Sequence, residues 1–302
     1  MNNMSVVKKK RITYRTWINL YFIIMSITFI LPFLLIVSAS LTNEDILAKE
    51  GFKIIPPFID WTGYKFVFSN VGEILRAYAI TTFQAFFGTF LSVLVMTLCA
   101  YPLSRKDFKF RKPITFFVFF TMLFNGGLIP TYLLNYKYLH LGNTIWIYIL
   151  PTLCSAFYII IFRTFFQGLP ISLVESAKLD GASEIRIFFQ IILPLSKPVL
   201  ATVALLTLLT KWNDWYTSLI YITDSHLYTL QFLLKRILQE VEFLRYMANN
   251  TPPGIDLSYL EDMPVETLKF AMCIIAAGPM LLVFPFFQKY FAKGLTVGSV
   301  KG

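Results

Sequence analysis

The residues best suited to hold a solute lie close together, near the end of an apolar stretch. Lys211 sits about 18 Å along the helix that this stretch predicts, and charges at that depth in a membrane usually face a bundle interior or a wet cavity. Lys211 and Asp214 are three residues apart, so they can neutralise each other on one helix face. Trp212 and Trp215 have the same spacing and offer flat faces on which a ring of a solute can stack, with Asn213 between them. Two interpretations stay open: an internal ion pair with two interfacial aromatics, or the lining of a path for a solute.

The sequence contains no group of residues with the types and spacing of a catalytic or metal-binding site. His140 and His226 are isolated and lie near expected loops. Cys99, Cys154 and Cys273 all fall inside apolar segments without a C-x-x-C spacing, so we interpret them as buried small hydrophobes. The sequence also lacks the Gly-x-x-x-x-Gly-Lys-Ser/Thr loop that holds phosphates and the Gly-x-Ser-x-Gly turn of many hydrolases. We therefore expect no catalytic residue, no metal and no nucleotide in this chain.

The composition is that of a membrane protein. Of 302 residues, 56% are hydrophobic and only 15% are charged, whereas a soluble domain carries about 25% charged residues. The mean hydropathy is +0.63. A net charge of +10 in such a chain usually reflects basic loops on the cytoplasmic side rather than a nucleic-acid surface.

Six stretches are long enough to cross a bilayer, which takes about 20 apolar residues in a helix. We expect an all-α integral membrane protein whose spanning helices cover residues 17–41, 77–104, 113–134, 144–162, 199–223 and 270–287, after a basic N-terminus at residues 1–16. The third stretch is interrupted by Asn125, Gly126 and Gly127. The interruption is either a polar point near a solute path or simply a helix end or close packing through small residues.

Basic residues decide the orientation. They gather before the first stretch and after the last, and they crowd the link at residues 105–112 against the single acid Asp107. The loops at 42–76 and 224–267 show no such excess. The positive-inside rule then places both termini and the segment 172–198 in the cytoplasm. The first apolar run is longer than the core of a signal peptide, about 7–15 residues, so we expect it to stay uncleaved.

The segment 172–198 is polar and lies between two apolar stretches. Ser172 and Glu175 have the spacing of a capping box, which predicts the start of a first helix. Gly181 stands where that helix would end in a left-handed residue, and Ser183 can cap a second helix. The pattern predicts a compact helix–turn–helix knob on the cytoplasmic face.

This segment resembles the coupling loop of permease subunits of ATP-binding-cassette importers. The family pattern runs E-A-A, three residues, G, and then a hydrophobic stretch that ends L-P-x-x-x-P. Ser176 replaces the usual second alanine, a change of one small residue for another. The matching residues are Glu175, Ala177, Asp180, Gly181, Ala182, Phe188, Leu193, Pro194 and Pro198.

The resemblance extends over most of the chain. The order of helices is similar to that of the second permease subunit in the maltose-type carbohydrate class, and residues 124–132 and 291–302 resemble the branch that handles complex oligosaccharides and polysaccharide fragments. It implies a type I importer fold in a bacterial cell membrane. It also implies a heterodimer with a related permease, two ATPase domains that bind ATP and Mg, and an extracellular solute-binding protein that delivers a carbohydrate.

Residue roles follow from the same resemblance. The coupling residues are expected to be Glu175, Ala177, Asp180, Gly181, Ala182 and Phe188, with the ATPase cleft at or near Glu175, Asp180 and Gly181. The candidate path residues are Asn125, Lys211, Trp212, Asn213, Asp214 and Trp215.

The external loop 224–267 contains an amphipathic pattern over Leu230–Asn249, which predicts a helix that either lies on lipid or meets a protein. The loop has more acidic than basic residues, which does not favour anionic lipid, so we expect contact with the binding protein. An ion-coupled secondary transporter is the main rival. Such carriers often show internal repeats and intramembrane acids, whereas this chain has no convincing repeat and one mid-membrane acid, Asp214.

Overall fold

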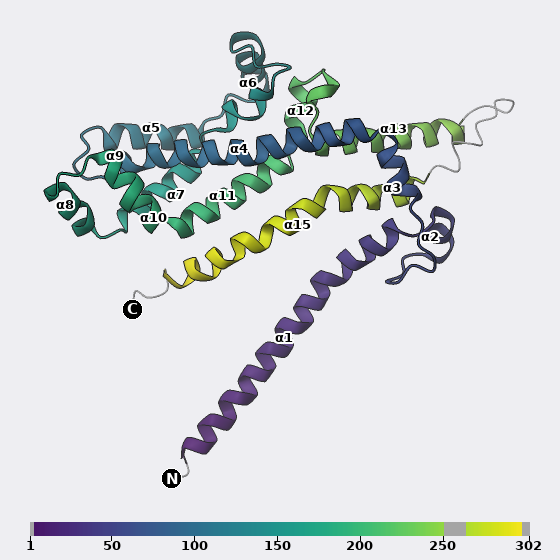
Figure 1. Cartoon of the computed structure of the whole chain (residues 1–302), viewed down its shortest axis with the longest axis horizontal. Coiled ribbons are helices and arrows are strands. Elements are labelled where there is room, and N and C mark those ends of the chain that lie inside the picture. Colours follow the sequence, from purple (N-terminus) through teal and green to yellow (C-terminus); the bar gives the residue numbers. More distant parts are fainter. Residues whose placement is uncertain (1–2, 251–263, 298–302) are drawn as a thin grey trace. The chain divides into compact units, whose positions relative to one another are not determined.

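The computed structural model describes residues 3–250 and 264–297, and every regular element among them is a helix. The chain forms two compact units, which are described separately: Met1–Asn70 with Ile237–Ala277, and Val71–Arg236 with Gly278–Gly302. The α-helices are α1 (Asn3–Ser40), α2 (Glu44–Glu50), α3 (Thr62–Val67), α4 (Val71–Ser104), α5 (Arg111–Leu123), α6 (Leu128–Leu133), α7 (Ala156–Gln167), α8 (Ile171–Leu179), α9 (Glu184–Ile187), α10 (Leu193–Leu195), α11 (Lys197–Trp212), α12 (Tyr216–Tyr221), α13 (Leu230–Asn250) and α15 (Val265–Val297) (Figure 1).

Short turns of 3₁₀- or π-helix connect several of these helices. They are η1 (Phe68–Asn70), η2 (Leu134–Tyr138), η3 (Ile145–Tyr148), η4 (Leu150–Thr152), η5 (Phe188–Ile192) and η6 (Ser225–Leu227). Two of them, η2 and η5, are π-helical, a form that is rare and is often found at functional sites.

Within residues 3–250 and 264–297, three helices are long and apolar enough to cross a membrane: Tyr14–Ser40, Thr62–Ser104 and Val265–Gln288. Three further pairs of helical pieces pass the same test together, and each pair is joined at a bend, as in a broken span or a re-entrant loop. The bends measure 114° between Arg111–Leu123 and Leu128–Tyr138, 49° between Ile145–Thr152 and Ala156–Gln167, and 80° between Glu184–Leu195 and Lys197–Trp212. With each bent pair counted as one span, the described residues hold up to six, which is the number of stretches predicted. The third pair differs from the predicted fifth stretch, because it includes the second helix of the segment 172–198 and ends at Trp212.

The predicted ends of the fourth and fifth stretches were wrong. The fourth stretch was predicted to end at residue 162, before Arg163, but α7 continues to Gln167. A charged residue does not end a helix when its side chain has a polar partner, and the Arg163 guanidinium donates through Nε to the carbonyl of Leu103 at 3.1 Å. The fifth stretch was predicted as one helix over 199–223, but α11 ends at Trp212, and the separate helix α12 begins at Tyr216.

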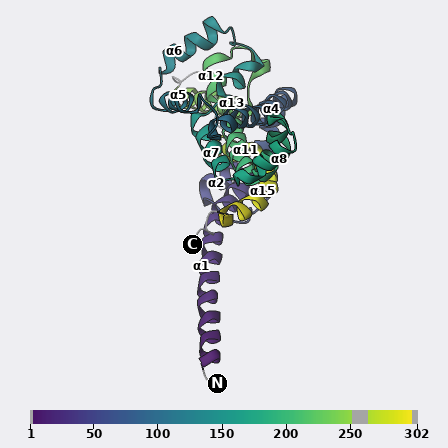
Figure 2. The same ribbon diagram turned by 90° about the vertical axis from the view of Figure 1, so that its left-hand side faces the viewer.

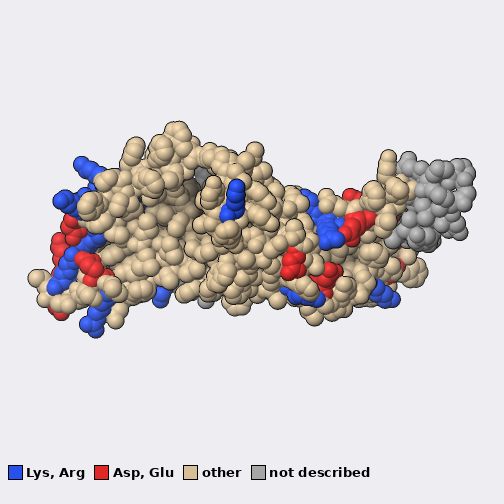
Figure 3. All heavy atoms as spheres, turned by 90° about the horizontal axis from the view of Figure 1, so that it is seen from above, with Lys and Arg blue, Asp and Glu red and all other residues tan. Residues whose placement is uncertain are grey.

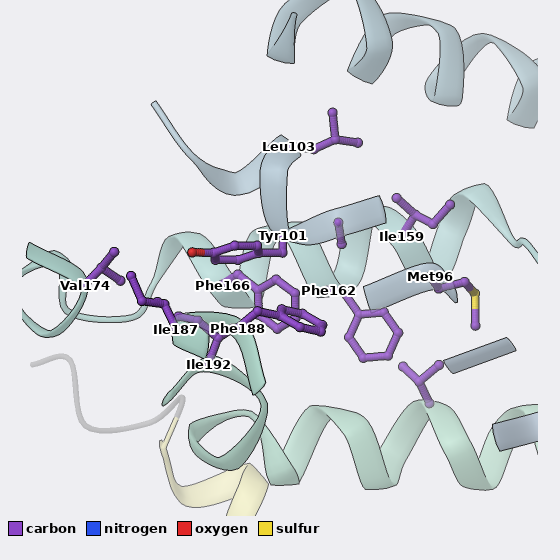
Figure 4. Packing of buried hydrophobic residues seen from close by; sticks show 12 residues of the cluster. Met96, Tyr101, Leu103, Ile159, Phe162, Phe166, Val174, Ile187, Phe188 and Ile192 are labelled. Carbon is purple, nitrogen blue, oxygen red and sulfur yellow. The ribbon is translucent and has the colours of Figure 1, made fainter. Parts of the chain in front are cut away.

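The second unit is organised around α4, which packs against both α7 and α11 (Figures 1 and 2). The buried face of α4 carries small residues at helical spacing, which let neighbouring backbones approach closely. They are Ala77, Thr81, Ala85, Gly88, Ser92 and Ala100. At the end of α4 that lies toward α8 and α9, larger apolar side chains form the core around the helix (Figure 4).

Lys211 is buried in this unit and is held by oxygen atoms. Its side chain is 5% exposed, and Nζ donates to the carbonyl of Tyr148 at 3.2 Å and to Thr152 Oγ1 at 2.6 Å. The space for its stem exists because residue 88 is glycine: a methyl group there would lie 3.0 Å from Lys211 Cε. Gln84 Nε2 also donates to the Lys211 carbonyl at 2.8 Å. Together these contacts connect α4, α11 and the turns η3 and η4.

In the first unit, the carboxylate of Glu44 caps the start of α15. Its oxygens accept hydrogen bonds from the backbone N–H groups of Glu266, at 3.1 Å, and Thr267, at 2.9 Å. A carboxylate is favourable there because the first N–H groups of a helix lack partners within the helix. Gly63 packs against Thr267 so closely that a methyl group at residue 63 would lie 3.1 Å from the Thr267 carbonyl oxygen.

The interruption of the third stretch is a helix end followed by a sharp bend. Asn125 Oδ1 accepts a hydrogen bond from the N–H of Gly127 at 2.9 Å, and Gly127 has a φ of 85°, a conformation that glycine adopts without strain. A methyl group at Gly127 would meet no described atom of this chain within 4 Å, so close packing within this subunit is not the reason for the glycine.

The contact between Gly88 and the Lys211 stem leads to a first prediction. Gly88→Ala should lower the free energy of unfolding by about 1–3 kcal/mol through overpacking. Combining it with Lys211→Ala, which vacates the space, should recover part of that loss. We expect a coupling energy of about 1 kcal/mol or more in thermal unfolding of the purified protein. Gly278→Ala is the control, because a methyl group there meets nothing within 4 Å. Simple additivity of the two changes would contradict the contact.

Candidate functional site

The first helix of the knob begins earlier than predicted. The residue that caps α8 is Pro170, with a φ of −59° and a ψ of 120°, and no side chain caps this helix end. The predicted capping box of Ser172 and Glu175 was therefore wrong. Proline fixes φ near the helical value and lacks an N–H, so the helix starts at Ile171 and Ser172 already lies inside its first turn.

The turn of the knob is a Schellman motif. The N–H of Gly181 donates to the Lys178 carbonyl at 3.0 Å, and the N–H of Ala182 donates to the Ala177 carbonyl at 2.9 Å. Gly181 has a φ of 79°, which confirms the predicted left-handed glycine. The motif usually brings together the two residues at the positions of Ala177 and Ala182, and both alanines pack against the apolar core.

The second helix of the knob starts as predicted and then changes form. Ser183 Oγ accepts a hydrogen bond from the N–H of Arg186 at 3.4 Å, which confirms Ser183 as the cap of α9. The chain then passes through the π-helical turn η5 and through α10. Pro198 stands at the start of α11, after the 80° bend.

Four buried side chains anchor the knob in the core of the second unit. Val174, Ile187, Phe188 and Ile192 belong to one apolar cluster with residues of α4 and α7 (Figure 4). The ring of Phe188 lies 5.4 Å from that of Tyr101, centroid to centroid. Phe188, predicted among the coupling residues, is thus placed to fix the knob to the membrane helices. Ile187 was not identified from the sequence.

The outer end of the knob is apolar and exposed. Leu179 is 90% exposed and Ile185 is 73% exposed, and the predicted coupling residues Glu175, Asp180 and Gly181 are exposed with them. Sequence reasoning missed Leu179. The sequence could have identified Leu179, because it is an apolar residue at the last position of a helix that ends in a Schellman motif. The apolar contact of that motif is made by other residues, so the leucine side chain is left exposed.

A chain of polar contacts braces the knob against the link that precedes α5. Glu184 accepts hydrogen bonds from Tyr101 Oη at 2.7 Å and from Lys178 Nζ at 2.6 Å. Lys178 Nζ also lies 3.4 Å from Asp107 Oδ2, and the other carboxylate oxygen, Asp107 Oδ1, lies 3.3 Å from Arg105 Nε. These residues come from α4, the 105–110 link, α8 and α9, and Figure 3 shows charged side chains gathered at this end of the unit. Nothing in the sequence pattern indicated this network.

The network shifts the pKa values of Lys178 and Asp107 in the directions that favour their charged forms. The hydrogen bond to Glu184 raises the pKa of Lys178. Partial burial acts to raise the pKa of Asp107, but hydrogen bonds from Arg105 and Lys178 outweigh it, so that pKa is lowered. The ion pairs are exposed and contribute little stability individually; their geometric effect is to restrain the angle between the knob and α4.

The residues 211–215 do not share one environment. Trp212 is 2% exposed and packs against Tyr78, whereas Asn213 is exposed. Trp215 is partly exposed, and Lys235 Nζ lies 3.2 Å above its ring centroid.

Lys211 and Asp214 lie apart in this cluster. Among the described residues, no ion pair within 4 Å joins them: Lys211 is held by Tyr148 and Thr152, and Asp214 Oδ1 accepts from the N–H of Thr217 at 3.0 Å. Lys211 and Asp214 nevertheless line the same cavity, which has a volume of about 440 Å³ and is also lined by several residues that carry hydroxyl groups.

The site consists of a knob anchored in the apolar core and of a polar cavity lined by Lys211 and Asp214. Among the described residues no three His, Cys, Asp or Glu side chains lie close enough together to hold a metal ion. The anchored knob connects its exposed end rigidly to the helices α4, α7 and α11.

Comparisons with known proteins agree with this arrangement. Residues 88–297 match the family described as "Binding-protein-dependent transport system inner membrane component". The chain is 38% identical over 286 residues to the polygalacturonan/rhamnogalacturonan transport system permease protein YtcP of Bacillus subtilis (strain 168), with 93% of this chain and 96% of that protein covered. It is 42% identical over 273 residues to protein LplC of the same organism, covering 90% of each.

A solved structure is also similar. The chain superposes with a TM-score of 0.77, at 28% identity, on a chain from the crystal structure of a bacterial ABC transporter involved in the import of the acidic polysaccharide alginate. The match covers 94% of this chain and 98% of that one. The protein therefore belongs to the binding-protein-dependent transport system inner membrane components: it is a permease subunit of an ATP-binding-cassette importer, a transport protein rather than an enzyme.

The left-handed turn leads to a second prediction. Gly181→Ala should lower the stability of the knob by about 1–2 kcal/mol, because an L-residue resists that conformation and no neighbouring atom lies within 4 Å to add a clash. Hydrogen exchange of the amides in 177–187 measures the loss. Gly168→Ala is the matched control, since Gly168 has a φ of −81°, and it should change little. Equal effects of the two substitutions would show that the backbone conformation is not the cause.

Proposed function

We propose that this chain is the membrane-spanning permease of an importer that takes up a carbohydrate, an oligosaccharide or polysaccharide fragment, delivered by an extracellular solute-binding protein. The named substrates of a close relative, polygalacturonan or rhamnogalacturonan, and of the similar structure, alginate, support this substrate class. The fold and the family support import driven by ATP. Uptake by the reconstituted complex in vesicles should need ATP and should persist when ion gradients are dissipated.

The observation that carries the proposal is the anchored knob with an apolar end. A rigid element that exposes Leu179 and Ile185 beside Glu175 and Asp180 has the composition of a docking surface, an apolar centre with a charged rim. Its partner is an ATPase subunit, which binds ATP and Mg. Two such ATPase domains serve the complex, one on each permease. Closure of the ATPase pair moves the knobs, and ATP and the loaded binding protein both favour the outward-facing state.

The remaining partners follow from the family and from the charge pattern. The second permease is a related but different chain, so that the pore is a heterodimer. Both termini face the cytoplasm of a bacterial cell, as the basic residues indicate. The external loop 224–267 contacts the binding protein. Its predicted helix is present as α13, while residues 251–263 of the same loop lie outside the described residues.

Of the residues predicted from the sequence to line the solute path, we propose that a smaller set contacts the solute directly. Asn213 and Trp215 are accessible in this subunit, and Lys211 and Asp214 line a cavity. Trp212 is in the core, so it can act on a solute only by positioning its neighbours. Asn125 is exposed beside the bend after α5.

A third prediction concerns the apolar end of the knob. The double change Leu179→Ala with Ile185→Ala should weaken retention of the ATPase subunits by about tenfold or more, since truncating a central interface residue often costs more than 1 kcal/mol. Co-purification and coupled ATP hydrolysis measure it. Ile54→Ala is the control: Ile54 is 55% exposed in the loop proposed to be external. Full retention of the ATPase by the double variant would contradict the docking assignment.

A fourth prediction concerns Trp215. Trp215→Ala should reduce ATP-dependent uptake by about fivefold to tenfold, the loss of one aromatic contact of about 1 kcal/mol, while the complex still assembles. Lys235→Met separates the possible causes, because it removes the cation above the ring and leaves the ring in place. If both variants lose uptake equally, the ring acts through Lys235 and not through contact with the solute.

A further inference from the structure

A basic cavity that the proposed function does not use lies between the start of α5 and the middle of α7. Its volume is about 390 Å³. It is lined by Arg111, Lys112, Thr115, Phe116, Phe119, Ile160 and Arg163. All of these residues belong to the second unit, and they come from two neighbouring helices.

The charges of this cavity are all of one sign. Three of its lining residues are cationic and none is acidic. Among the described residues, no carboxylate lies within 4 Å of Arg111, Lys112 or Arg163. Arg163 uses Nε for the carbonyl of Leu103, which orients its guanidinium and leaves the terminal nitrogens for another acceptor. Such a cluster is complementary to an anion.

Two features of α5 support the need for an anion. Its first turn holds Arg111 and Lys112 and no acid, although the partial positive charge of a helix N-terminus disfavours cations there. Thr115, one turn further on, has a hydroxyl oxygen that is buried and has no hydrogen-bond partner in the structure. Buried hydroxyl groups normally have a partner, and an acceptor in the cavity would supply one.

The remaining walls of the cavity are apolar and face outward. Phe116 is 68% exposed and Phe119 is 46% exposed, and with Ile160 they continue the cavity along the spanning part of α5. A free phosphate ion has no use for such walls, whereas the acyl chains of a lipid do. Basic pockets between membrane helices on the cytoplasmic side are known to hold anionic headgroups.

We propose that this cavity binds one anionic phospholipid of the inner leaflet. Arg111, Lys112 and Arg163 bind the phosphate, Thr115 Oγ1 donates to one of its oxygens, and the acyl chains lie along Phe116 and Phe119. The inference rests on the orientation given under the proposed function, which puts the 105–112 link in the cytoplasm.

The test is lipid binding to the purified, intact complex. Wild-type protein should retain phosphatidylglycerol in native mass spectra and should melt at a higher temperature in nanodiscs that contain phosphatidylglycerol than in pure phosphatidylcholine. Arg111→Gln with Lys112→Gln should weaken phosphatidylglycerol binding roughly 25-fold, because each basic side chain near an anionic headgroup contributes about a factor of five. Thr115→Val should weaken it several-fold without a change of charge.

The control is Lys106→Gln with Lys109→Gln, which removes the same charge from the same link outside this cavity. Equal losses in the control and in the Arg111 and Lys112 variant would overturn the proposal, because general attraction to the bilayer would then explain the binding. Stabilisation of the detergent-solubilised complex by inorganic phosphate to the same extent would also overturn it. Neither readout depends on sugar uptake or ATP hydrolysis, so a failure here is distinguishable from a failure of the proposed function.

Discussion

The structure depends on the burial of four apolar side chains of the knob in the core that α4, α7 and α11 share. Val174, Ile187, Phe188 and Ile192 leave water for a cluster that already holds large residues of α4 and α7. Full burial of such a side chain is worth about 1.5–3 kcal/mol, far more than any of the exposed ion pairs nearby. The knob is therefore part of the core, and any displacement of it is transmitted to the membrane helices.

The polar brace has a different task. Tyr101, Glu184, Lys178 and Asp107 add restraints on direction, since each contact fixes the distance between two separate elements. Apolar burial is not directional, so it alone would allow the knob to rotate on its anchor. The combination leaves Leu179 and Ile185 in a defined position, which a partner can bind without ordering them first.

The sequence was a good guide where one local rule decides the structure. Helix length and hydropathy predicted six spans, and a glycine or serine at a helix end predicted the turn at Gly181 and the cap at Ser183. It failed where distant residues decide. The predicted capping box does not form, because Pro170 is the residue that caps α8. The Lys211 ammonium donates to oxygens on η3 and η4 and does not pair with Asp214. Trp212 is buried in the core and does not face a solute path. None of these outcomes follows from spacing along one helix.

The glycine at position 88 has a mechanical consequence. The Lys211 stem fills the space of the missing side chain, and its ammonium reaches two oxygens beyond. Sliding α11 along α4 by a single residue, about 1.5 Å, would separate the ammonium from both oxygens and push the stem against the α4 backbone. Axial slippage between these helices is therefore disfavoured. The close contact between α4 and α11 therefore favours movement of these two helices as one body in any conformational change of this unit.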